Sequence, residues 1–169
     1  MTVIVTGAAG FIGMHTAQRL LDRGETVVGV DNFNTYYDPA LKPARSARLE
    51  ESSRFRMVRM DISDAEGFAA LVRETGAKRI VHLAAQAGVR YSIENPFAYQ
   101  QANLAGHLSV LEAALGREAV KVFKPMQPGD VTATFADVSQ LKALTGYDPR
   151  VPLEDGIPRF VEWYRSFYG

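Results

Sequence analysis

The first 115 residues alternate short apolar runs with longer segments in which apolar residues recur every three or four positions. The short runs predict buried strands, and the longer segments predict amphipathic helices. The predicted strands cover residues 3–5, 26–30, 55–60 and 79–83. The predicted helices cover residues 11–23, 39–51, 65–75 and 96–114, with residues 84–94 as a loop. Strand and helix therefore alternate along this part of the chain.

Residues at the helix ends agree with these boundaries. Gly24 and Gly76 follow the last apolar positions of two helices, where glycine commonly ends a helix. Asn95 precedes Pro96, a pair typical of an N-cap followed by the first helical position.

Strands that alternate with helices predict a parallel sheet joined by right-handed crossovers. The strands lack a regular apolar–polar alternation, which is typical of a sheet covered on both faces. We therefore predict an α/β fold, a Rossmann-like parallel sheet with strand order 3-2-1-4 flanked by helices.

The pattern changes beyond Gly116. Residues 125–130 predict a loop, and residues 138–144 and 153–168 predict two helices. We therefore expect a domain of residues 1–115 and a C-terminal helical tail of residues 116–169. The β-prone residues 119–124 are a candidate fifth strand beside residues 79–83, whose outer edge would otherwise be exposed.

Charge and composition exclude several classes of partner. The chain has 19 basic and 19 acidic residues, so we expect neither nucleic acid nor an anionic membrane as a partner. It has no cysteine, and its three histidines lack the spacing of metal ligands, so we predict no metal site. The N-terminus has no pattern of a signal peptide, so we expect a cytoplasmic protein.

Three glycines follow the first predicted strand and open the first predicted helix. Gly7 would allow a tight turn, Gly10 the close approach of a pyrophosphate, and Gly13 the packing of the helix against the strand. The alternative is a simple turn with incidental glycines. The strand–turn–helix context favours a dinucleotide site.

Asp31 closes the second predicted strand, 18 positions after Gly13. A carboxylate at this offset binds the adenosine ribose and disfavours a 2′-phosphate. Neither Asn32 nor Phe33 offers a cation for such a phosphate, so the sequence predicts NAD rather than NADP. The alternative is a solvated Asp at the end of a strand.

Asp61 and Ile62 follow the third strand, where the adenine of a bound dinucleotide would lie. A helix-capping role for Asp61 remains the alternative, although Ser63 or Asp64 could also cap the next helix. Residues 82–88 follow the fourth strand at the topological switch point, and their small side chains would admit a cofactor.

Several residues that could carry chemistry have simpler explanations. For His82 we favour a hydrogen-bonded core position. For Tyr36, Tyr37, Tyr91 and Tyr99 we favour aromatic packing or a hydroxyl that binds a loop.

With these residues the chain resembles an extended short-chain dehydrogenase/reductase, and within that superfamily the nucleotide-sugar 4-epimerases that act on UDP-glucuronate. The resemblance extends over nearly the whole chain. It rests on residues 6–13, 31–34, 36–38, 82–92, 95–96, 98–99, 103–104, 125–131, 136–137 and 146–147.

The resemblance implies an NAD site and an isomerase chemistry in which NAD takes a hydride from C4 of the sugar and returns it to the opposite face. It implies that Arg90 points toward a UDP-sugar. The residues implied to bind NAD are Gly7, Gly10, Phe11, Ile12, Gly13, Asp31, Asn32, Asp61, Ile62, Leu83, Ala84, Ala85, Gln86 and Asn103.

The chain departs from the resemblance at the catalytic pair. Members of the family carry a Tyr-x-x-x-Lys pair, but no Tyr of this chain is followed four positions later by Lys. We therefore assign no catalytic residue. We interpret the sequence as an epimerase that lacks its central segment, with the join near residues 111–118.

Three functions stay open at this point. The first is an NAD-binding protein of the epimerase family that is catalytically incomplete. The second is a binding or regulatory module that associates with an intact homologue, or with a second copy of itself. The third is an active epimerase completed by other groups, which the missing Tyr/Lys pair disfavours.

Overall fold

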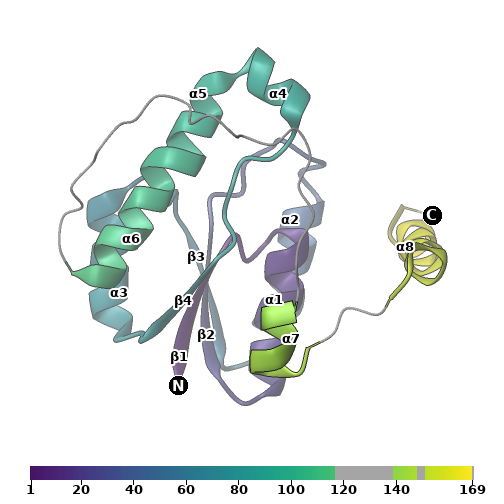
Figure 1. Ribbon diagram of the computed structural model, residues 1–169, viewed down its shortest axis with the longest axis horizontal. Coiled ribbons are helices and arrows are strands. Elements are labelled where there is room, and N and C mark those ends of the chain that lie inside the picture. The colour runs from purple at the N-terminus through teal and green to yellow at the C-terminus, as the bar shows by residue number, and fades with distance from the viewer. Residues whose placement is uncertain (117–138, 148–150, 169) are drawn as a thin grey trace. The chain divides into compact units, whose positions relative to one another are not determined.

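The computed structural model describes residues 1–116, 139–147 and 151–168. Residues 1–121 form one compact unit and residues 122–169 a second. The first unit holds a parallel sheet of strand order β3-β2-β1-β4, as predicted (Figure 1). Its strands are β1 (Thr2–Thr6), β2 (Thr26–Asp31), β3 (Phe55–Arg59) and β4 (Arg79–His82).

Helices cover both faces of this sheet (Figure 1). In the first unit they are α1 (Phe11–Asp22), α2 (Leu41–Glu50), α3 (Ala65–Thr75), α4 (Val89–Glu94), α5 (Pro96–Tyr99), the π-helix η1 (Gln100–Gly106) and α6 (His107–Leu115). In the second unit the described helices are α7 (Ser139–Thr145) and α8 (Leu153–Tyr168).

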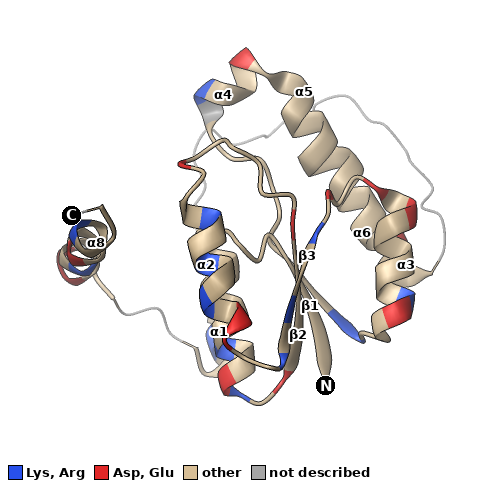
Figure 2. Ribbon diagram, turned by 180° about the vertical axis from the view of Figure 1, so that it is seen from behind, with Lys and Arg blue, Asp and Glu red and all other residues tan. Residues whose placement is uncertain are grey.

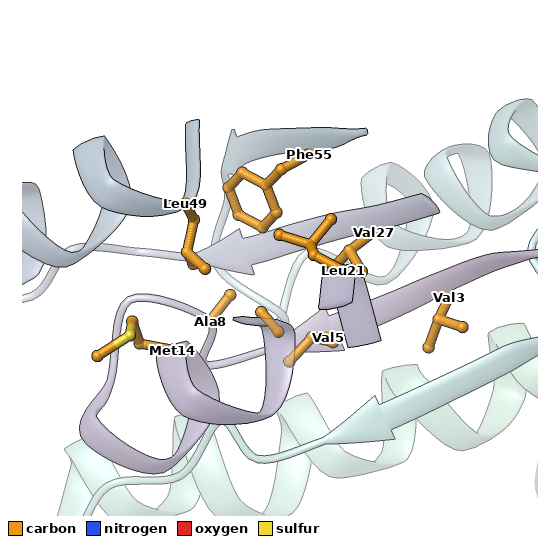
Figure 3. Close-up of a cluster of buried hydrophobic side chains, with 9 residues drawn as sticks. Val3, Val5, Ala8, Met14, Leu21, Val27, Leu49 and Phe55 are labelled. Carbon is orange, nitrogen blue, oxygen red and sulfur yellow. The ribbon is translucent and has the colours of Figure 1, made fainter. Parts of the chain in front are cut away.

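The side chains of successive β1 residues pack into two separate hydrophobic cores. Val3 and Val5 pack with α1 and α2 in a buried cluster that also contains Leu21 and Leu49 (Figure 3). Ile4, between them, packs with α3 and α6 on the opposite face. Both faces of the strand are therefore apolar, which explains the missing alternation in the sequence.

Two of the predicted elements are wrong in part. The predicted loop 84–94 contains the helix α4, which begins after Gly88 (φ +104°) and ends at Asn95. Six residues are too few to show a helical period. The predicted helix 96–114 begins as expected at Pro96, with the Asn95 side chain accepting from the Ala98 amide, but η1 interrupts its α-helical bonding.

The predicted ends of the other helices are confirmed closely. Gly24 and Gly76 have positive φ angles, as residues that end helices commonly do. The helix predicted over residues 153–168 is α8, while the predicted 138–144 is α7, displaced by one residue. No helix in the described parts of the chain combines the length and apolar character that crossing a membrane requires.

The strand β4 lies at one end of the sheet and pairs with β1. Among the described residues no strand pairs with its other edge. The candidate fifth strand, residues 119–124, lies outside the described residues and stays a prediction. The predicted join near residues 111–118 includes residues 117 and 118, which also lie outside the described residues, so this join stays a prediction as well.

Candidate functional site

The loop between β1 and α1 forms a tight turn at Gly7. Gly7 has φ +69°, and its amide donates to the Val30 carbonyl oxygen at 2.7 Å. A Cβ atom at this position would lie 2.8 Å from the Ala84 nitrogen. Both the backbone angle and the close approach of the loop after β4 therefore require glycine here.

Gly13 and Gly10 serve different purposes. A Cβ atom at Gly13 would lie 2.7 Å from the Gly7 carbonyl carbon, so the helix packs directly on the turn. Close packing at Gly13 is therefore observed, but the contact is with the turn at Gly7 and Ala8, whereas the predicted contact was with the strand. A Cβ atom at Gly10 would lie 3.0 Å from the Gly7 carbonyl oxygen, which is a tight contact, and would meet no other atom beyond its chain neighbours within 4 Å, so the space on its other side is open.

The first turn of α1 faces this open space with backbone donors. Gly10 is the N-cap residue and provides no side-chain cap, and the first turn has no acidic residue. Phe11 and Ile12 are 62% and 65% exposed although both are apolar. An uncapped helix N-terminus beside open space fits an anionic ligand.

Asp31 is buried at the end of β2, so the alternative of a solvated Asp is wrong. Its Oδ2 accepts from the Ala9 amide at 3.2 Å, and its Oδ1 accepts from the Phe33 amide at 2.9 Å. Lys42 Nζ donates to the same Oδ1 at 2.8 Å in a buried ion pair. The carboxylate is therefore oriented toward the loop after β1.

Sequence reasoning missed the two basic residues of α2 that face this region. Lys42 also donates to Asn34 Oδ1 at 3.1 Å, and the Arg45 guanidinium donates to the Ala9 carbonyl oxygen at 3.4 Å. Basic residues follow α2 along its length (Figure 2). The residues next to Asp31 in the sequence include no cation, whereas these two lie beside the loop in space. Their spacing of three positions at the start of a helix was the available signal.

Asp61 is tied to Asn32 and Ser63. Asn32 Nδ2 donates to Asp61 Oδ2 at 2.9 Å, and the Ser63 amide and hydroxyl donate to Oδ1 at 3.0 and 2.8 Å. Partial burial acts to raise the pKa of Asp61, but these hydrogen bonds outweigh it and hold the pKa below its ordinary value.

The cap of α3 is Asp64, whose side chain accepts from the Gly67 amide at 3.0 Å. The alternative that Asp61 caps this helix is therefore wrong. Ile62 is 5% exposed and packs in the core between the sheet and α3. Its side chain is therefore part of the hydrophobic core.

Asn103 holds the loop after β4 at two points. The Gln86 amide donates to Asn103 Oδ1 at 2.7 Å, and Asn103 Nδ2 donates to the Gln86 carbonyl oxygen at 3.0 Å. Asn103 lies on the π-helix η1, a type of element frequent at functional sites. A cavity of about 360 Å³ lies beside this loop, lined by His82, Leu83, Ala84, Ala85, Asn103 and His107.

His82 makes the expected hydrogen bond, but it is partly buried and lines the cavity instead of lying in the core, whereas the tyrosines make the ring and loop contacts that the sequence favoured. His82 Nδ1 lies 2.6 Å from Thr6 Oγ1. Tyr36 packs on Tyr37 and on Tyr91 with ring centroids 4.7 Å apart in both pairs, and Tyr99 donates to the Gly88 carbonyl oxygen. The rings join the loop after β2 to the segment after β4.

Two of the sequence predictions concern groups outside this cluster of contacts. Arg90 is exposed on α4, which follows the loop after β4. Among the described residues, no group of three or more His, Cys, Asp or Glu side chains could hold a metal ion.

The arrangement has three parts. The glycine turn of residues 7–13 at the N-terminus of α1, here called the cradle, lies beside open space, Asp31 is buried at the end of β2, and small residues form the loop after β4. A sequence profile of the family described as GDP-mannose 4,6 dehydratase matches residues 4–123. The chain belongs to this family of extended short-chain dehydrogenases/reductases that includes the nucleotide-sugar 4-epimerases.

Two plant relatives illustrate the match. The chain is 52% identical over 112 residues to UDP-glucuronate 4-epimerase 4 of Arabidopsis thaliana, covering 66% of this chain and 25% of that protein. It is 48% identical over 155 residues to UDP-glucuronate 4-epimerase 1 of the same plant, covering 92% of this chain and 33% of that protein. The chain thus spans a quarter to a third of the length of these relatives.

Solved structures give the same result. A UDP-glucuronic acid 4-epimerase from Bacillus cereus in complex with UDP-glucuronic acid and NAD is 38% identical, with a TM-score of 0.60 over 67% of this chain and 36% of that one. A UDP-glucose 4-epimerase from Thermus thermophilus in complex with NAD is 37% identical, with a TM-score of 0.56 over 67% of this chain and 33% of that one. The resemblance seen in the sequence is confirmed.

Proposed function

We propose that residues 1–116 bind NAD. The observation that carries this proposal is the open space beside Gly10 at the uncapped start of α1, which the pyrophosphate would fill. The two similar epimerase structures, both of them complexes with NAD, support it.

Each predicted NAD-binding residue then has a task consistent with its position. Gly7, Gly10 and Gly13 shape the turn, and the amides of Phe11 and Ile12 face the phosphates. Asp31 lies beside the adenosine ribose, and Asn32, Asp61 and Ile62 border the adenine. The loop residues Leu83, Ala84, Ala85 and Gln86, held by Asn103, form the wall toward the nicotinamide.

The charge of Asp31 alone does not explain a preference for NAD over NADP. The buried Lys42 neutralises this carboxylate, so simple charge repulsion against a 2′-phosphate is weakened. We still propose NAD, because a carboxylate at the end of β2 is the partner expected for the adenosine ribose, and both similar epimerase structures are complexes with NAD. When bound, NAD supplies a reversible hydride acceptor, while the protein orients it.

We further propose that the chain is catalytically incomplete. No Tyr is followed four positions later by Lys anywhere in the sequence, so a general base paired with a lysine is missing. The chain spans only a quarter to a third of the length of its relatives, which fits a chain shorter than an intact epimerase, and we propose that the missing part is the central segment. Because the chain would lack this central segment, we expect a UDP-sugar facing Arg90 to bind only weakly.

The alternative function is a binding module that associates with an intact homologue or with a second copy. The observation that favours it is the outer edge of β4, which is unpaired among the described residues. An exposed strand edge readily accepts another strand.

The deciding experiment identifies any nucleotide released from the purified protein and measures NAD binding by calorimetry. We expect NAD to bind and UDP-glucuronate to show no C4 epimerisation. An absence of any NAD binding would overturn the proposal, and measurable epimerisation would show that the chain is catalytically complete. Co-purification with a full-length homologue would support the alternative.

A further inference from the structure

Thr6 and His82 are the last residues of β1 and β4 and lie in register with each other. The Thr6 side chain is fully buried, and its Oγ1 lies 2.6 Å from His82 Nδ1. The same Oγ1 accepts from the Ala84 amide at 3.2 Å and from the Leu83 amide at 3.1 Å, and the Leu83 amide also donates to the Thr6 carbonyl oxygen at 3.2 Å. One hydroxyl therefore joins the imidazole to the first peptide of the loop after β4.

These contacts favour one protonation state of His82. A threonine hydroxyl has two acceptor positions and one donor. The two backbone amides lie on the acceptor side of the hydroxyl, which favours donation of its proton to His82 Nδ1. This arrangement corresponds to a neutral imidazole with its proton on Nε2. A protonated imidazole carries a proton on both nitrogens and cannot accept this bond.

The Leu83–Ala84 peptide held in this way is also a wall of the loop after β1. A Cβ atom at Gly7 would lie 2.8 Å from the Ala84 nitrogen and 2.9 Å from the Leu83 carbonyl carbon. The two loops that would hold NAD thus meet at this peptide. Asn103 holds the same loop farther along, at Gln86.

One other titratable residue faces His82. The imidazole of His107 on α6 lies with its ring centroid 5.1 Å from that of His82. Of the described residues that line the cavity at this point, only these two histidines titrate. Partial burial and the charge of His107 both lower the pKa of His82 below its ordinary value.

We propose that Thr6 and His82 are a positioning pair that holds the Leu83–Ala84 peptide against the phosphate-binding turn only while His82 is neutral. Protonation of Nδ1 turns the bond around, so that the Thr6 hydroxyl faces a third donor and loses its bond to the Ala84 amide, whereas the Leu83 amide keeps the Thr6 carbonyl oxygen. The consequence for affinity rests on the proposed NAD binding, whereas the positioning itself is a property of the protein without nucleotide.

The direction of the pH effect follows from the lowered pKa. Neutral His82 is favoured in the folded protein, so its contribution to folding is complete above the ordinary histidine pKa of about 6.5. It is lost as the pH falls through the lower pKa of the folded state. We expect NAD affinity to fall over the same range.

The first test uses the protein without nucleotide. Nitrogen-15 NMR of the imidazoles should show His82 unprotonated at Nδ1 and protonated at Nε2 at neutral pH. The Ala84 amide should be protected from hydrogen exchange above the His82 pKa and lose about tenfold protection below it, after correction for intrinsic exchange, while the Leu83 amide should stay protected by the Thr6 carbonyl oxygen. A proton on Nδ1 at neutral pH, or Ala84 protection independent of the His82 titration, would overturn the proposal.

Variants separate positioning from packing. In His82→Asn the amide oxygen replaces Nδ1 as an acceptor but does not titrate, so protection and NAD affinity should become independent of pH. Thr6→Val removes the hydroxyl and should lower NAD affinity about tenfold, the value of one hydrogen bond. Thr6→Ser should restore it. The matched control is His15→Asn on α1, whose pH profile should remain that of the unmodified protein.

The outcomes distinguish this proposal from the proposed function. If NAD fails to bind at any pH, the proposed function fails, and the NMR measurements still decide the role of the pair. If NAD binds with the same affinity across the His82 titration, the positioning pair is refuted and NAD binding stands. If Thr6→Val does not fold, His82→Asn and Thr6→Ser give the decision.

Discussion

The β1–β2 half of the sheet and the β4 end differ in how completely they are surrounded. Val27 and Val30 of β2 and Ile4 and Val5 of β1 are fully buried, between strands on both sides. Arg79 at the start of β4 is exposed, and the rest of β4 is only partly buried. The cradle and the buried acid lie in the first half, and a cavity lies in each region, one lined by residues of β1, β2 and β3 and one beside the loop after β4. In the proposed complex, the phosphates and ribose of NAD would lie at the surrounded half of the sheet and the nicotinamide at the open side.

The largest effect should come from Gly10→Val, which lies in the loop after β1, in the β1–β2 half of the molecule. The side chain would fill the open space beside the turn, so NAD affinity should fall about a hundredfold or more. The Cβ atom would lie 3.0 Å from the Gly7 carbonyl oxygen, so the turn must shift by a few tenths of an ångström and a small loss of stability is expected. Calorimetry with NAD and thermal unfolding measure the two effects. Unchanged affinity would show that the cradle does not hold the pyrophosphate.

Asp31→Ala should come next. It removes the ribose partner and leaves Lys42 buried without its counter-charge, which costs about 3 kcal/mol of folding free energy by the usual value for a broken buried pair. NAD affinity should fall about thirtyfold, from the loss of charged hydrogen bonds, and discrimination against NADP should decrease. Denaturant unfolding and titrations with both cofactors provide the measurements. An unaltered cofactor preference would mean that Asp31 does not contact the ribose.

A smaller effect is expected at the boundary between the two regions. Asn103→Ala removes both hydrogen bonds to Gln86, and we expect about a tenfold loss of NAD affinity. Asn103→Asp keeps only the acceptor for the Gln86 amide and serves as a control with an intermediate loss. Equal affinities for all three proteins in calorimetry would exclude a role for this loop in binding.

The smallest effect should be Leu115→Gln on α6, near the open side. Leu115 is 62% exposed, so the free energy of unfolding should change by less than about 0.5 kcal/mol. Chemical denaturation at two protein concentrations measures it. A larger loss that depends on concentration would show that a second copy covers this surface, which supports the alternative function.

Patterns confined to short sequence distances predicted much of the fold. The β-branched runs, the glycines at helix ends and the Asn95–Pro96 pair set the strands and most helix boundaries. Strand order 3-2-1-4 followed because short crossovers leave few arrangements. The helix α4 was missed since six residues show no period, and η1 since a π-turn has no distinctive composition.

The candidate site divides in the same way. The glycine turn and Asp31 follow a spacing, so the sequence contains them. Lys42 reaches Asp31 from 11 positions away, and Thr6 reaches His82 across 76 positions, so only the folded chain brings these partners together. Their chemistry depends on burial, which a linear pattern does not record.

The buried pair of Asp31 and Lys42 has a consequence for how this protein could diverge. Its two side chains are only 4% and 11% exposed, so either charge left alone would be costly. Substitutions at the two positions are therefore not independent, and the second change is favourable only after the first. A descendant that loses the Asp31 carboxylate is therefore expected to replace Lys42 as well, although the two residues lie on different elements of the fold.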